Sequence, residues 1–158
     1  MKKIQVNEII SKAKELNSHG KNWHFHMLGK NCKFNESKEK FCLVLEEGKK
    51  VFCAVFEEKP LKEAKILADL LYGKNFLEKK QEGKTNPEFQ AIIKRAYELE
   101  KQKTEWHHHH LPPECVFNEQ KGKHCIVLED EKETLIAVYS KKPMNDLVKI
   151  EKLFYKDL

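Results

Sequence analysis

Apolar residues recur at helical spacing in two segments, one near the start of the chain and one near its middle. Residues 7–19 place their apolar side chains three and four positions apart, and His19-Gly20 follows as a stop signal. The second segment begins with Asn86 at a position suited to an N-cap and with Pro87 at the first helical position. Both segments are therefore predicted to form amphipathic helices.

Nearly continuous apolar runs follow each predicted helix. Residues 41–56 and 124–139 each contain two such runs separated by a short charged segment, which is the pattern of a β-hairpin. The runs are apolar at nearly every position, so we expect a sheet that is covered on both faces or folded into a shared interior. After each hairpin a Lys-Pro step, at Pro60 and Pro143, predicts the first turn of a closing helix.

The second half of the chain repeats the first half at a constant offset of 83 residues, without a gap. We interpret the chain as two copies of one unit that have diverged at many surface positions. The motif Trp23-His24-Phe25-His26 recurs as Trp106-His107-His108-His109, and other matched positions include Cys32 and Cys115, Asn35 and Asn118, Cys42 and Cys125, and Glu46 and Glu129.

Each copy is close to the size at which a single hydrophobic core becomes marginal, so we expect the two copies to share a core. The predicted fold is α+β, with two tandem α-β-β-α repeats that form a pseudo-twofold domain. In each repeat a helix, a Trp-His-x-His loop, a β-hairpin and a second helix follow in order, and the hairpins would form one small antiparallel sheet flanked by helices. The predicted boundaries are 1–75 for repeat 1, 76–86 for a polar linker and 87–158 for repeat 2.

Composition narrows the class of protein. The chain has 35% charged residues and a formal net charge of +5, with Lys and Glu interspersed, so nucleic acid binding is permitted but not indicated. No apolar stretch reaches membrane-spanning length, and polar residues precede any apolar run near the start. We expect a cytoplasmic monomer whose two repeats mimic a dimer.

Five cysteines are an odd number, and Cys42, Cys53 and Cys125 lie inside the apolar runs. A secreted disulfide framework normally has an even number of cysteines in a loop-rich chain, so we predict reduced thiols. We interpret the matched pair Cys42 and Cys125 as small buried hydrophobic residues.

The candidate chemistry lies in the repeated Trp-His-x-His motif. In an extended segment, residues two apart point to the same side, so the two histidines of each motif would face one way. A cysteine follows six residues after the second histidine of each motif, and it could close back as a third ligand. Imidazole nitrogen and thiolate sulfur together suit zinc, with iron or copper as alternatives. The predicted metal ligands are His24, His26, Cys32, His107, His109 and Cys115.

A packing interpretation competes with the metal site. Trp23 and Trp106 anchor the motif in either case, and they could close the end of the first helix while the histidines bond backbone groups. Glu36 and Glu119 could add a fourth ligand, or Glu119 could act as the general base of a catalytic site. The asparagine before each of these glutamates is interpreted as a cap for local backbone groups.

The second copy has more histidines than the first, because His108 replaces Phe25 and His110 replaces Met27. We therefore expect it to be the active half if the protein is an enzyme. The segment Trp106-His107-His108 resembles the signature of a group of His-Asn-His-type toxin nucleases, whose adjacent histidines supply a metal ligand and a general base. That resemblance covers only these residues and implies phosphodiester cleavage.

Three functions follow from these patterns. The first is a small intracellular metal-binding protein with duplicated His-x-His sites. The second is a metal-dependent hydrolase of a phosphate ester or nucleic acid, in which nearby lysines hold a small anionic ligand. The third is a partner-binding module without catalysis, whose histidines are packing residues. The lysines proposed for the anion are Lys38, Lys40, Lys121 and Lys123.

Overall fold

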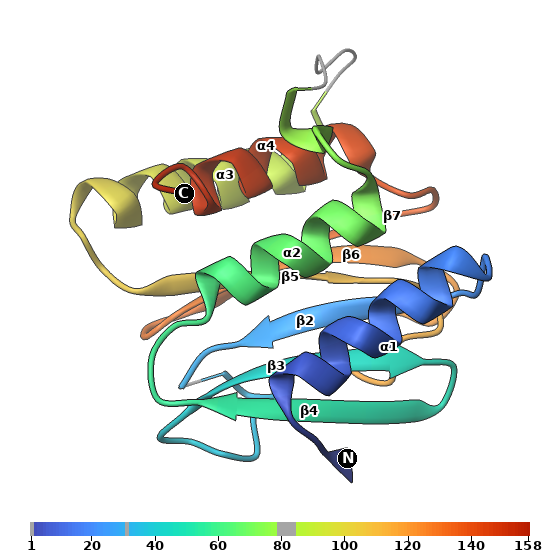
Figure 1. Ribbon diagram of the computed structural model, residues 1–158. Coiled ribbons are helices and arrows are strands. Elements are labelled where there is room, and N and C mark those ends of the chain that lie inside the picture. Colours follow the sequence, from blue (N-terminus) through green and yellow to red (C-terminus); the bar gives the residue numbers. More distant parts are fainter. Residues whose placement is uncertain (1, 31, 79–84) are drawn as a thin grey trace. The chain divides into compact units, whose positions relative to one another are not determined.

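The computed structural model describes residues 2–30, 32–78 and 85–158, and the chain divides into two compact units, Met1–Phe76 and Leu77–Asp157 (Figure 1). Each unit is described by itself. The predicted polar linker at 76–86 begins with a 3-10 helix, Phe76–Glu78, and its residues 79–84 lie outside the described part of the chain. The repeat boundaries at 1–75 and 87–158 remain a prediction.

The first unit packs two helices against one mixed sheet. Its elements are β1 (Lys2–Lys3), α1 (Val6–Ser18), β2 (His24–Leu28), β3 (Phe41–Glu47), β4 (Lys50–Phe56) and α2 (Leu61–Tyr72). The strand order is β1-β4-β3-β2, in which β1 pairs parallel with β4 and the other pairs are antiparallel. Helix α1 contacts β3 and β4, and α2 contacts α1 and β2.

The second unit has the same order of helices and strands, without a counterpart of β1 among its described residues. Its elements are α3 (Pro87–Lys101), β5 (Trp106–Leu111), β6 (His124–Asp130), β7 (Thr134–Tyr139) and α4 (Met144–Phe154). The strands form an antiparallel sheet in the order β5-β6-β7. Helix α3 begins as predicted, because Asn86 Oδ1 accepts a hydrogen bond from the Glu88 N–H at 2.8 Å.

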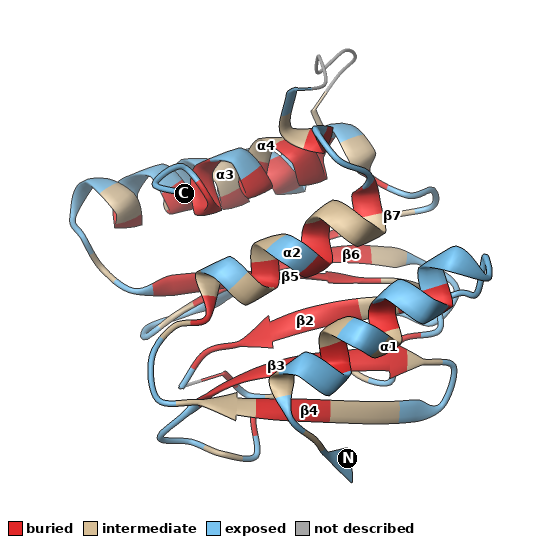
Figure 2. Ribbon diagram, in the orientation of Figure 1, coloured by how far each residue is buried: buried red, intermediate tan, exposed pale blue. Residues whose placement is uncertain are grey.

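Strands β2, β3, β5 and β6 are buried along nearly their whole length, whereas β4 and β7 are only partly buried although their sequences are equally apolar. Figure 2 shows β2, β3 and β5 as buried almost throughout. In the first unit, Leu45 pairs with Phe25 and Phe52, and the Phe52 ring lies 4.8 Å from the Lys12 ammonium of α1. This row therefore forms the helix-covered face of the sheet, and the alternate residues of each strand point to the opposite face.

The structure confirms a mixed α+β fold but corrects two details. The Trp-His-x-His segment is a strand and not a loop, so each unit reads α-β-β-β-α, and each unit builds its own sheet. In the first sheet β2 and β1 occupy the two sides of the hairpin, which leaves neither hairpin edge for a shared four-stranded sheet. The pseudo-twofold arrangement stays a prediction. None of the helices in the described residues has the length and apolar character that a membrane crossing requires.

Candidate metal centres

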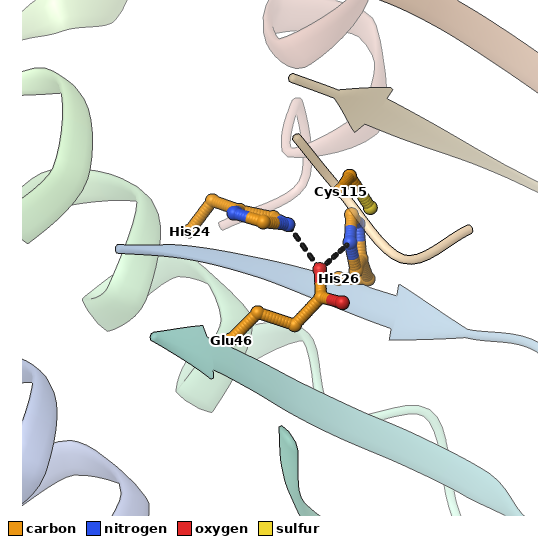
Figure 3. Close-up of side chains that lie close together, drawn as sticks. All are labelled: His24, His26, Glu46 and Cys115. Atoms are coloured by element: carbon orange, nitrogen blue, oxygen red, sulfur yellow. Dashed lines mark hydrogen bonds and ion pairs between the residues drawn. The ribbon is translucent and has the colours of Figure 1, made fainter. Parts of the chain in front are cut away.

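Strands β2 and β3 bring two histidines and a glutamate together on the face opposite the helices. His24 and His26 lie two residues apart on β2 and so point to the same side, and Glu46 on β3 is the cross-strand partner of His24. Figure 3 shows both imidazoles directed at the Glu46 carboxylate. His26 Nε2 lies 2.9 Å from Glu46 Oε2, and His24 Nε2 contacts the same oxygen. We call these three residues the first His-His-Glu cluster.

The second unit builds the same arrangement from β5 and β6. His107 pairs across the strands with Glu129, and His107 Nε2 lies 2.7 Å from Glu129 Oε2. His109 Nε2 lies 3.8 Å from the same oxygen. The two imidazole rings are 4.8 Å apart between centroids, as they are in the first cluster. His107, His109 and Glu129 form the second His-His-Glu cluster.

The donor atoms of each cluster are close enough to surround one cation. In both units the two imidazole nitrogens and the carboxylate oxygen lie within 4.8 Å of one another. Ligand bonds to zinc are about 2 Å long, so donor atoms bound to one ion lie roughly 3–4 Å apart. Small rotations of the side chains would therefore bring either set of three donors around a single ion.

Burial and hydrogen bonding together set the charge of the first cluster. Burial alone would raise the pKa of the Glu46 carboxyl, but hydrogen bonds from His24 and His26 outweigh it and hold that pKa far below its usual range. Burial lowers the pKa of His26, and this effect exceeds the opposing hydrogen bond to Glu46. The cluster thus presents an ionised carboxylate and a neutral imidazole, which are the protonation states that a metal ion requires.

The additional histidines of the second unit point away from the second cluster. His108 lies on the helix face, where its Nε2 is 2.9 Å from Glu151 Oε1 of α4 and its ring packs edge-on against Phe154. His110 stacks on His124, with ring centroids 5.5 Å apart. Because neighbouring residues of a strand face opposite sides, these two histidines add no donors to the second cluster.

The predicted anchor residues are buried, whereas the glutamates predicted as a fourth ligand or general base are exposed. Trp23 and Trp106 are buried, and Trp106 Nε1 donates a hydrogen bond to Glu100 at the end of α3. Glu36 and Glu119 are exposed on the loops that follow the histidine strands. A general-base role for Glu119 stays a prediction, as does a thiolate ligand from Cys32 or Cys115, both of which are buried.

Cys42 and Cys125 are buried on β3 and β6, in agreement with the packing interpretation. Burial, with a smaller contribution from neighbouring Cys53, raises the pKa of the Cys42 thiol to about 11. Burial also raises the pKa of Cys125. Both side chains are therefore thiols and not thiolates at neutral pH, as small core residues should be.

Glu46 and Glu129 are the cluster residues that sequence reasoning missed. Each belongs to a matched stretch of three residues, and each is a charged residue at the end of an apolar run. That combination could have marked them as candidate site residues, because a buried acid that recurs at matched positions needs a partner. The partner itself depends on strand register, which a single strand does not reveal.

No protein-family model matches the chain, and no curated protein matches it significantly. The resemblance to toxin nucleases therefore rests on the three residues beginning at Trp106 alone. What the fold and the clusters define is an α+β protein with buried His and Glu groups able to hold a metal ion.

Proposed function

We propose that the protein binds one metal ion in each His-His-Glu cluster, with zinc as the expected metal. The observation that carries the proposal is the buried glutamate beneath two imidazoles, which occurs at the same positions of both units. A buried carboxylate in an otherwise apolar strand is unfavourable for folding unless it has a specific partner. Retention of all three donors in two diverged copies is readily explained by a shared ligand.

The donor set favours zinc among the common metals. Two imidazoles and one carboxylate are a familiar zinc set, although the same set also binds iron(II). A bound cation would take the place of the protons now shared between imidazole Nε2 and the carboxylate oxygen. The rings would then carry their protons on Nδ1, so metal uptake would release protons or shift the tautomers.

The test is the metal content of the chain purified without a histidine tag, measured by inductively coupled plasma mass spectrometry. Wild type is expected to hold one ion per cluster. The double variants His24→Ala/His26→Ala and His107→Ala/His109→Ala should each lose one ion, and Glu46→Gln and Glu129→Gln should weaken the corresponding site. His19→Ala, which removes an exposed histidine at the end of α1, is the matched control and should change nothing.

Metal-free wild type that shows no thermal shift with zinc, iron or copper would overturn the proposal. The histidines would then be packing residues of a partner-binding module. Unchanged metal content in a variant that lacks all four cluster histidines would also overturn it, because the ions would have to bind elsewhere.

A metal-dependent hydrolase is the second candidate, since catalytic zinc sites use three protein ligands and keep one position for water. The burial of the donors favours binding over catalysis, because a substrate needs access to the ion. Turnover of model phosphate esters by the zinc-loaded protein, abolished in His107→Ala with the fold intact, would establish the enzyme. Zinc-loaded protein without turnover leaves the binding function alone.

A further inference from the structure

A buried asparagine organises the loop between β5 and β6. Asn118 is 1% exposed, and its Nδ2 donates hydrogen bonds to three backbone carbonyls, of which Lys123 O is the nearest at 2.7 Å. Its Oδ1 accepts hydrogen bonds from Gln120 N–H at 2.8 Å and from the Cys125 thiol at 3.5 Å. One side chain therefore joins the two ends of the loop to the adjacent strand.

The first unit repeats most of these contacts. Asn35 is also 1% exposed, and its Nδ2 donates to Gly29 O at 2.8 Å and to Lys40 O at 2.7 Å. Its Oδ1 accepts from Ser37 N–H and from the Cys42 thiol, at 2.9 and 3.2 Å. The predicted capping role of the asparagines is confirmed. The matched strand cysteines also gain a role, as donors to the asparagine.

Each loop also holds the backbone of one cysteine through several hydrogen bonds. The Cys115 carbonyl accepts hydrogen bonds from the Asn118 N–H and from Lys121 Nζ, both at 3.0 Å, while the Cys115 N–H donates to Pro112 O. The equivalent contacts hold Cys32 through Asn35 and Lys38. Lys38 and Lys121, which the sequence suggested as part of an anion-binding rim, are therefore engaged with the cysteine carbonyls.

We propose that Asn35 and Asn118 are positioning residues of the metal centres, which hold the loops so that Cys32 and Cys115 supply thiolate ligands. The inference rests on the proposed metal-binding function. A ligand held on a rigid loop loses little conformational entropy when it binds, whereas a free loop would lose more. Burial of the two cysteines and the closely similar asparagine contacts in both units are what such preorganisation requires.

The experiment loads the full-length, metal-free protein with cobalt(II), which reports its ligands spectroscopically. Wild type should show the near-ultraviolet charge-transfer band of a cobalt–thiolate bond, and Cys32→Ser and Cys115→Ser should each remove about half of it. Combining each serine variant with the cluster histidine variants assigns each thiol to a cluster. Asn118→Ala should weaken cobalt and zinc binding by about 10- to 100-fold and reduce the band.

The control is Val148→Ala, a buried residue of α4 whose truncation lowers stability without touching the loop. It should bind metal with wild-type affinity while folded. Circular dichroism of each metal-free variant shows whether it folds. If Asn118→Ala does not fold, the presence or absence of the cobalt–thiolate band in wild type decides whether the cysteines are ligands. Cobalt binding without a thiolate band overturns the inference but leaves the His-His-Glu sites standing. A folded Asn118→Ala variant with unchanged affinity and band also overturns it. Absence of any metal binding in wild type removes the proposed function itself.

Discussion

Strands β2 and β5 carry the same donors on one face and different residues on the other. His24 and His107 occupy equivalent positions above equivalent glutamates. On the helix face, Phe25 of the first unit is replaced by His108, and Ala68 of α2 corresponds to Glu151 of α4. Two positions that are apolar in one unit are thus a buried His-Glu pair in the other, so the fold itself does not require polar residues there.

The largest expected effect on stability comes from replacing first one member and then both members of the His108–Glu151 pair. His108→Phe alone should lower the free energy of unfolding by about 3–5 kcal/mol, because it leaves the Glu151 carboxylate buried without its partner. The double variant His108→Phe/Glu151→Ala, which copies the first unit, should recover most of that loss or exceed wild type. Urea unfolding monitored by circular dichroism measures both values. Equal stability of the single and double variants would show that the buried pair has no such cost.

The next largest effect concerns the response of the first cluster to acid. The pKa of His26 is lowered in the folded state, mainly by burial, whereas the unfolded chain takes up this proton near pH 6.5. The stability contributed by the neutral imidazole is therefore full above that pH. It should be lost as the pH falls, by up to about 1.4 kcal/mol per pH unit until the folded pKa is reached.

Urea unfolding of the metal-free protein across this pH range measures the slope. His26→Gln should flatten it, and the matched His109→Gln variant compares the second cluster with the first. A slope that His26→Gln leaves unchanged would mean that other groups carry the acid sensitivity.

The smallest effect distinguishes the first helices of the two units. Helix α3 has a side-chain cap from Asn86, whereas Gln5 at the start of α1 makes no capping hydrogen bond. Asn86→Ala should therefore cost about 1 kcal/mol, and Gln5→Ala should cost almost nothing. Thermal unfolding of the two variants gives the comparison. Equal losses would show that the side-chain hydrogen bonds of Asn86 contribute little to stability.

The sequence predicted the elements whose signals are local. The helix expected over 7–19 is Val6–Ser18, and the hairpin expected over 41–56 is β3 and β4. Strands β2 and β5 were mistaken for loops because histidines interrupt the apolar pattern, although the extended conformation assumed for the metal site was correct. Glu46 and Glu129 could not be assigned to the histidines in advance, because their partnership depends on how two strands pair.

Each cluster forms only when its two strands pair in the correct register. A slip of one residue between β2 and β3 would turn Glu46 toward the helices and leave His24 and His26 without their carboxylate. A slip of one residue in either direction therefore separates the three donors. An ion that binds all three donors would therefore stabilise the native strand pairing relative to pairings shifted by one residue. Each bound ion would in this way favour the correct register of its own sheet during folding.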